Sequence, residues 1–365
     1  MLGLSIRWFG GKNPVIHKNV EGEIQRNYQI DNIRAIAILL VVIGHSIIIY
    51  SSSWGLYKSS NNCAFFDYCK AFINIIQMPI FFAVSGFLFA FSVDRKQFMS
   101  IVKDKANRLL IPYIFFAFLW LLPIRLIVNY PGYSGKSLVT IVVRYLLYGS
   151  DNGHLWYLIA LFWIFVFASI IIRFCNRHIS DTKLLLNIKH NEHTISCLFF
   201  LAFSILLLGV GKIVNLFYFN TVSQYMIWFA LGLVIHDCYA KLQKVKTVTK
   251  IGAFTISLLL SIICLCKRNG VIHFLLSIIA AFLLIIFLFI IVPNKKINVL
   301  SYLSSVSFGV YLFHSPLVYI SYTYFPDIHP LLMLFVNFIL FGLVSLTLTQ
   351  LFKKCKLKSV IGEYR

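Results

Sequence analysis

The stretch of sequence that decides the fold is IDNIRAIAILLVVIGHS, from Ile30 to Ser46. It is an apolar run with an acid and a base near its start, Asp31 and Arg34, and a histidine near its end, His45. On a helix of 3.6 residues per turn, separations of three and eleven residues return to nearly the same face. These three side chains therefore share one stripe, with His45 about 16 Å further along the axis than Arg34 at 1.5 Å per residue.

This stripe has two interpretations. Ionisable groups inside a membrane span are costly, so their presence indicates a functional site. Alternatively, Asp31 and Arg34 only mark the start of the helix, where an acid is favoured near the positive end of the helix dipole. In that case His45 is an ordinary hydrogen-bonded histidine inside a bundle. This helix by itself does not decide between the two.

The composition of the 365-residue chain is that of a membrane protein, because 59% of the residues are hydrophobic and 12% are charged. The mean hydropathy is +0.84. We predict an all-α polytopic membrane protein, a bundle of about ten transmembrane helices without a large soluble domain. The expected spans run roughly over 33–50, 71–92, 109–129, 155–173, 195–213, 222–237, 250–266, 271–292, 303–322 and 330–351.

The formal net charge of +21 is carried by loops between the apolar runs, which argues against a nucleic-acid partner and for contacts with anionic lipid. With the N-terminus inside the cell, 24 of the 33 Lys and Arg residues fall on the cytoplasmic side, so both termini are expected there. No apolar core precedes a cleavage site, so no signal peptide is expected. We predict cytoplasmic tails over 1–29 and 353–365, flanking a transmembrane domain over 30–352.

The eight cysteines are scattered and form no CxxC pair, so no metal site is expected. Cys63 and Cys69 share a predicted loop and are near enough in sequence for a disulfide, although most of the chain has no such link.

Three later stretches carry further candidates. The second span contains QMPIFFAVSGFLFA, in which Pro79 interrupts the hydrogen bonding and Ser85-Gly86 permits close approach of backbones; ordinary helix packing explains both equally well. The third span begins KDKANRLLIPYIFF, in which Lys105 and Arg108 share a helical face. With Arg34 they form a candidate cationic pocket for a phosphate-bearing cofactor from the cytoplasm, or they only anchor the span.

The remaining candidates are histidines and aromatic residues. The stretch DNGHLWYLIALFW supplies His154, Trp156 and Tyr157, although the two aromatic residues also suit a membrane interface. The ninth span, SSVSFGVYLFHSPLVYI, supplies His314. Three histidines at membrane depth, with His45 as the first, predict proton handling in acyl transfer or in proton-coupled transport.

Taken together and in this order, these stretches resemble the acyltransferase 3 family of bacterial inner-membrane O-acyltransferases, from about Tyr28 to Leu351. Arg34 and His45 match the family's arginine and histidine separated by ten residues, and Asp31-Asn32 precedes them as in the family. The later matching stretches are PIFFAVSGFLF, KANRLLIPY, HLWYL and FGVYLFHSPL.

The resemblance implies a multi-pass inner-membrane enzyme that moves an acetyl group from cytoplasmic acetyl-CoA to a hydroxyl of a surface polysaccharide, such as lipopolysaccharide, or of its lipid-linked precursor. The resemblance is to the standalone type, so no extracytoplasmic esterase-like domain is expected. His45 is implied to be the catalytic base or the acyl carrier, with Arg34 essential beside it, and we expect Asp31 to orient Arg34. Lys105 and Arg108 are implied to contact the phosphates of coenzyme A. The motif positions with a substrate or structural role are Ser85, His154, Trp156, Tyr157 and His314.

The chain departs from the family at one of these positions, because Lys105 stands where the family has arginine, so a bidentate phosphate contact is not expected there.

Two other functions remain open on the residues alone: an exporter of a polysaccharide or lipid-linked glycan, and a scaffold for glycan-assembly proteins. The exporter lacks support from a matching pair of interrupted spans in two halves. The acceptor glycan, the acyl group and the oligomeric state stay open.

Overall fold

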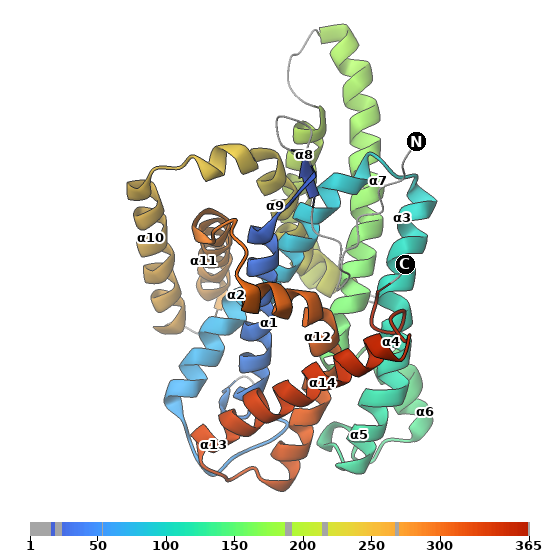
Figure 1. The fold of residues 1–365 in the computed structure, drawn as a ribbon, viewed down its shortest axis with the longest axis vertical. Coiled ribbons are helices and arrows are strands. Elements are labelled where there is room, and N and C mark those ends of the chain that lie inside the picture. The colour runs from blue at the N-terminus through green and yellow to red at the C-terminus, as the bar shows by residue number, and fades with distance from the viewer. Residues whose placement is uncertain are drawn as a thin grey trace.

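The computed structural model describes residues 16–18, 24–52, 54–186, 192–213, 218–266 and 270–363. Figure 1 shows a bundle of long helices, to which the N-terminal segment adds one pair of short antiparallel strands, β1 (Ile16–Lys18) and β2 (Ile24–Arg26). Nine helices within the described residues are long and apolar enough to cross a membrane. The predicted all-α polytopic membrane architecture is confirmed.

The nine spans combine single helices with helices that follow one another without a break. Single helices form α1 (Tyr28–Ser46), α2 (Ala64–Val93), α7 (Trp156–Leu186), α8 (Glu192–Ile213), α10 (Thr247–Cys266), α11 (Gly270–Ile291) and α12 (Asn298–Tyr324). The span Phe98–Ile127 joins α3 (Phe98–Lys105), α4 (Ile111–Phe116) and α5 (Leu122–Ile127) through wider π turns, and Pro330–Lys354 joins α13 (Pro330–Leu334) to α14 (Phe341–Lys354). Two short helices precede α7, namely α6 (Leu138–Thr140) and the turn Gly153–Leu155.

The predicted span 222–237 lies in α9 (Phe219–Gln243), which is not one of the nine helices that are apolar enough to cross a membrane. The prediction of ten spans is therefore one higher than the number of such helices within the described residues. Its central residues are buried, so α9 is enclosed by protein there. A Cβ added to Gly86 of α2 would lie 1.9 Å from the carbonyl oxygen of Phe229, and one on Gly232 would lie 1.9 Å from that of Ala83. The backbones of α2 and α9 therefore touch, as the Ser85-Gly86 pair predicts.

We call the side where α1 begins the inner side and the side where it ends the outer side. α12 runs parallel to α1, because Ser304 contacts Asp31 near the inner side and His314 contacts His45 further along both helices. Beyond α14 the chain folds back on the inner side, where Ile361 is buried and Glu363 pairs with Lys353 at 2.6 Å.

Cys63 and Cys69 are free thiols, so the disulfide that their spacing allowed is not formed. Cys63 lies directly before α2 and Cys69 lies inside it, so the two no longer share a loop.

Candidate functional site

Two histidines from α1 and α12 form a hydrogen-bonded pair. His45 Nδ1 lies 2.8 Å from His314 Nε2, and His314 Nδ1 lies 2.9 Å from the carbonyl oxygen of Val310. A carbonyl oxygen can only accept, so we assign the proton of neutral His314 to Nδ1, and its Nε2 then accepts from His45. This assignment leaves a lone pair on His45 Nε2, which has no hydrogen bond to any residue that the structure describes.

The third predicted histidine lies against the same pair. The ring centroid of His154 is 5.8 Å from that of His314, and Tyr311 donates a hydrogen bond to the His154 carbonyl oxygen. His154 Nε2 lies 3.1 Å from the carbonyl oxygen of Leu312, so Nε2 is the donor and Nδ1 carries a lone pair. That Nδ1 is buried and has no partner in the described part of the chain. The structure thus brings together three histidines from three helices.

The loop before α7 is shaped to place His154. Gly153 has φ +56°, and a Cβ there would lie 3.0 Å from an Arg125 side-chain nitrogen. Arg125, which is 1% exposed, donates to the Asp151 carboxylate at 3.2 Å and to the Tyr319 hydroxyl at 2.9 Å. We did not predict a role for Arg125 from the sequence, although a lone arginine within the apolar run LLPIRLIV is such a signal.

Asp31 and Arg34 are both buried, and Arg34 is 7% exposed. The predicted pair between them is present at 3.9 Å. Ser304 donates to the Asp31 carboxylate at 3.1 Å, and Arg34 donates to the Ser307 hydroxyl at 3.2 Å. The inner end of the stripe is therefore bound to α12, in the same way as its outer end is bound through His314.

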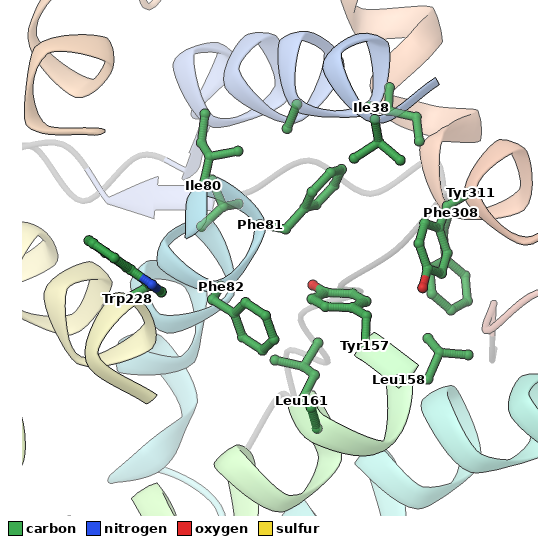
Figure 2. Close-up of a cluster of buried hydrophobic side chains, with 14 of the residues drawn as sticks. Ile38, Ile80, Phe81, Phe82, Tyr157, Leu158, Leu161, Trp228, Phe308 and Tyr311 are labelled. Atoms are coloured by element: carbon green, nitrogen blue, oxygen red, sulfur yellow. The ribbon is translucent and has the colours of Figure 1, made fainter. Parts of the chain in front are cut away.

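An aromatic layer lies on the path between these two ends. Figure 2 shows Tyr157 of α7 between Phe81 of α2 and the pair Phe308 and Tyr311 of α12. The Tyr157 and Tyr311 ring centroids are 5.6 Å apart, and the Tyr157 hydroxyl lies 3.4 Å from that of Ser85. A cavity of about 10 Å³ lies in this layer, room for about one water molecule. A longer molecule needs these side chains to move before it can pass.

Trp156 takes part in packing beside this layer. Its ring centroid lies 4.9 Å from that of Tyr225 of α9 and 6.3 Å from that of Phe82. It therefore holds α7 against α2 and α9.

The basic pair at the third span is divided between two environments. Lys105 is buried, with its ammonium nitrogen 3.9 Å from the ring centroid of Phe165 and 5.8 Å from that of Phe89. Arg108 is half-buried and lies in the π turn Ala106–Leu110. Lys105 therefore makes a cation–π contact here, and a phosphate contact would compete with it.

Lys70 of α2 is a candidate that sequence reasoning missed. It is 3% exposed and has no hydrogen bond within the described residues. A Cβ added to Gly44, next to His45, would lie 3.1 Å from the Lys70 ammonium nitrogen and 2.8 Å from Gln77 Oε1. This Gln77 oxygen is also buried without a partner in the described chain. A cation and an amide oxygen thus lie beside α1 at the level of His45.

An outer pocket of about 560 Å³ is lined by the segment after α1 and by residues of α2, α9 and α11. Its wall includes Asn74, which accepts a hydrogen bond from Gln77 Nε2 at 2.8 Å. The rest of its lining mixes polar groups and aromatic rings and includes Ser52, Asp67, Gln224, Tyr225, Trp228, His273 and Ser277.

The helical bundle and its cluster of three imidazoles define a polytopic membrane protein with titratable groups inside the bundle. The comparison with known families identifies which one: the model of the acyltransferase 3 family, described as an acyltransferase domain, matches residues 27–354. The chain belongs to this family, as its motifs predict, and its fold is that of a multi-pass membrane protein.

Two curated relatives are similar over a shorter segment. Nodulation protein NolL of Sinorhizobium fredii is 35% identical over 94 residues, which is 26% of this chain and 24% of that protein. Nodulation protein NolL of Mesorhizobium japonicum is 32% identical over 94 residues, with the same coverage. The match therefore spans about a quarter of the length of these relatives. No solved structure matches the chain.

Proposed function

We propose that this protein is an acyltransferase that moves an acetyl group from cytoplasmic acetyl-CoA to a hydroxyl of a surface polysaccharide, or of its lipid-linked precursor, in the inner membrane of a bacterium. The observation that supports this most is the hydrogen-bonded chain from Val310 through His314 to His45. It leaves the lone pair of His45 Nε2 available as a general base.

In the proposed reaction, His45 Nε2 takes the proton of the acceptor hydroxyl while the acceptor oxygen bonds to the acetyl carbonyl carbon. The bond from that carbon to sulfur then breaks, and the thiolate of coenzyme A takes the proton back from Nε2. While His45 is protonated, its Nδ1–H still donates to His314, so the cation is stabilised without another proton transfer. The Lys70 ammonium lies beside Gly44, the residue before His45, and supplies positive charge for the oxyanion.

His45 can also carry the acetyl group itself, because attack by Nε2 on the acetyl carbonyl uses the same lone pair. In that route the imidazole is acetylated before the acceptor arrives. The two routes are distinguished by mass analysis of protein that has reacted with acetyl-CoA without an acceptor and is then quenched. Only the second route yields an acetylated His45.

Arg34, Lys105 and Arg108 are the residues proposed to hold the phosphates of coenzyme A, because all three are basic and belong to the inner halves of their helices. The thioester then has to pass the aromatic layer at Tyr157 to approach His45. The proposal therefore requires opening of that layer when the donor binds.

The outer pocket is proposed to receive the sugar acceptor. Its volume of about 560 Å³ is in the range of small-ligand sites. Trp228 and Tyr225 supply flat apolar faces, and Asn74 and Gln224 supply amides that can donate to and accept from sugar hydroxyls.

The test compares surface glycans from cells that express the wild-type protein, His45→Ala or the control His178→Ala, which alters an exposed histidine. We expect acetyl esters with the wild type and the control, and none with His45→Ala at equal membrane abundance. Normal ester content with His45→Ala would refute the mechanism. Loss of the polymer itself would instead support the exporter.

A further inference from the structure

A second cluster of reactive side chains lies at the inner ends of α2, α8 and α9, apart from the three histidines. His193 and Cys197 lie one turn apart on α8, and Asp237 lies opposite them on α9. The ligand atoms of these three residues all lie within 4.8 Å of one another. Within the described residues, this is the one group of at least three His, Cys, Asp or Glu side chains with that geometry.

The distances fit the edges of a tetrahedral metal site. His193 Nδ1 lies 3.1 Å from either Asp237 oxygen and 3.6 Å from Cys197 Sγ. A zinc ion bound to nitrogen and oxygen at about 2.0 Å and to sulfur at about 2.3 Å separates its ligands by about 3.3 Å and about 3.5 Å respectively. Two edges of one face of such a tetrahedron are thus present, and the third, from Cys197 Sγ to an Asp237 oxygen, is no longer than 4.8 Å.

A second layer of polar groups orients these candidate ligands. His193 Nε2 lies 3.5 Å from an oxygen of Asp94, and the other Asp94 oxygen accepts from Asn176 at 3.0 Å. His236 Nδ1 lies 3.1 Å from the Asp237 carboxylate. A carboxylate on the far nitrogen of a histidine and a hydrogen bond to a ligating carboxylate are the usual supports of metal ligands.

We propose that His193, Cys197 and Asp237 bind a zinc ion, with a fourth position left for a water molecule. Sulfur, nitrogen and oxygen donors together suit zinc, whereas magnesium and calcium prefer oxygen alone. The thiolate and the Asp237 carboxylate together balance the charge of the dication. The metal links α8 to α9, and through Asp94 to α2, so its role is to stabilise the inner face.

The competing interpretation is an ion pair in which a protonated His193 lies between Asp94 and Asp237. The two interpretations differ in what they require of Cys197. Zinc needs its thiolate, whereas the ion pair leaves the thiol as a packing neighbour of His193.

The experiment measures metal in the purified full-length protein after removal of metal by a chelator and reloading with zinc. We expect about one zinc per chain in the wild type and in the control Cys175→Ser, which removes a buried thiol outside the cluster, and a loss of most of it in Cys197→Ser and Asp237→Asn. Loading with cobalt provides a second readout, because a thiolate-to-cobalt charge-transfer band appears only if Cys197 is a ligand.

If a variant fails to fold, the zinc content and the cobalt spectrum of the wild-type protein still test the proposal. Absence of stoichiometric zinc and of the charge-transfer band in the wild type would refute the site and support the ion pair. Equal metal content in the wild type and a folded Cys197→Ser would show adventitious binding only, and would also refute it. Neither readout depends on acyl transfer, so the site and the proposed function fail independently.

Discussion

Replacing His314 by phenylalanine isolates the hydrogen bond that orients the proposed base. Phenylalanine has a ring of similar size, which suits a site that is 1% exposed, but it offers no acceptor to His45 Nδ1. The bond is neutral in the resting enzyme and charge-assisted once His45 is protonated. These two kinds of bond contribute about 1 kcal/mol and about 2–3 kcal/mol, so about 1–2 kcal/mol of stabilisation is specific to the protonated state.

That difference corresponds to a fall in kcat of about 5- to 30-fold, with further loss where the His45 ring turns away. We expect His314→Gln to recover part of the rate, because its amide oxygen can accept from His45 Nδ1. The KM for the acceptor should change little, since His314 Nε2 is already occupied by His45.

The assay measures release of the coenzyme A thiol by the purified protein at saturating acetyl-CoA and varied acceptor. An unchanged kcat in a folded His314→Phe variant would refute the orienting role. A loss as complete as that of His45→Ala, without recovery in His314→Gln, would indicate that His314 itself is the base.

Three further outcomes follow from the same geometry. Lys70→Met should lower kcat by about 100-fold through loss of oxyanion stabilisation, whereas Lys58→Met, at an exposed lysine, should not; equal rates would exclude Lys70. Phe81→Ala removes a buried ring from the aromatic layer, so it should lower stability by about 3–5 kcal/mol and increase acetyl-CoA hydrolysis without acceptor, and unchanged hydrolysis would contradict a barrier there. Gly153→Ala strains a residue at φ +56°, so it should lower the free energy of unfolding by at least about 1 kcal/mol in thermal unfolding and should also lower activity. The control Gly55→Ala, at a position with no neighbour within 4 Å, should change neither stability nor activity.

Much of the fold is predictable because a membrane imposes a simple physical requirement on each span. An apolar run of about 20 residues has to become a helix, so length and hydropathy locate the helices without any knowledge of their packing. α9 is the instructive case. Its interior is buried by protein, so it is a long helix whose hydropathy falls below that of the other spans.

The candidate site is predictable only where it lies on one helix. The spacing of Arg34 and His45 follows from helical geometry, but the contact between His45 and His314 joins residues 269 positions apart. Which side chains meet across helices depends on packing that local sequence does not encode. The lone pair on His45 Nε2 follows from the Val310 carbonyl oxygen, a backbone atom whose position no motif specifies.

Two omissions have physical causes of the same kind. The expected span 71–92 leaves Lys70 in the loop before it, yet α2 begins at Ala64 and buries Lys70. The His193, Cys197 and Asp237 cluster has no CxxC spacing, since its third member comes from another helix 40 residues later. Spacing rules for metal sites detect ligands on one local segment, so they miss a cluster assembled by helix packing.

The most direct test of the central claim uses purified protein in sealed vesicles, with labelled acetyl-CoA enclosed on the inner side and a glycan acceptor outside. The account predicts label on the outer glycan with the wild-type protein and background label with His45→Ala at equal insertion. Equal transfer by the two proteins would contradict a role for His45 in carrying the acetyl group to the acceptor.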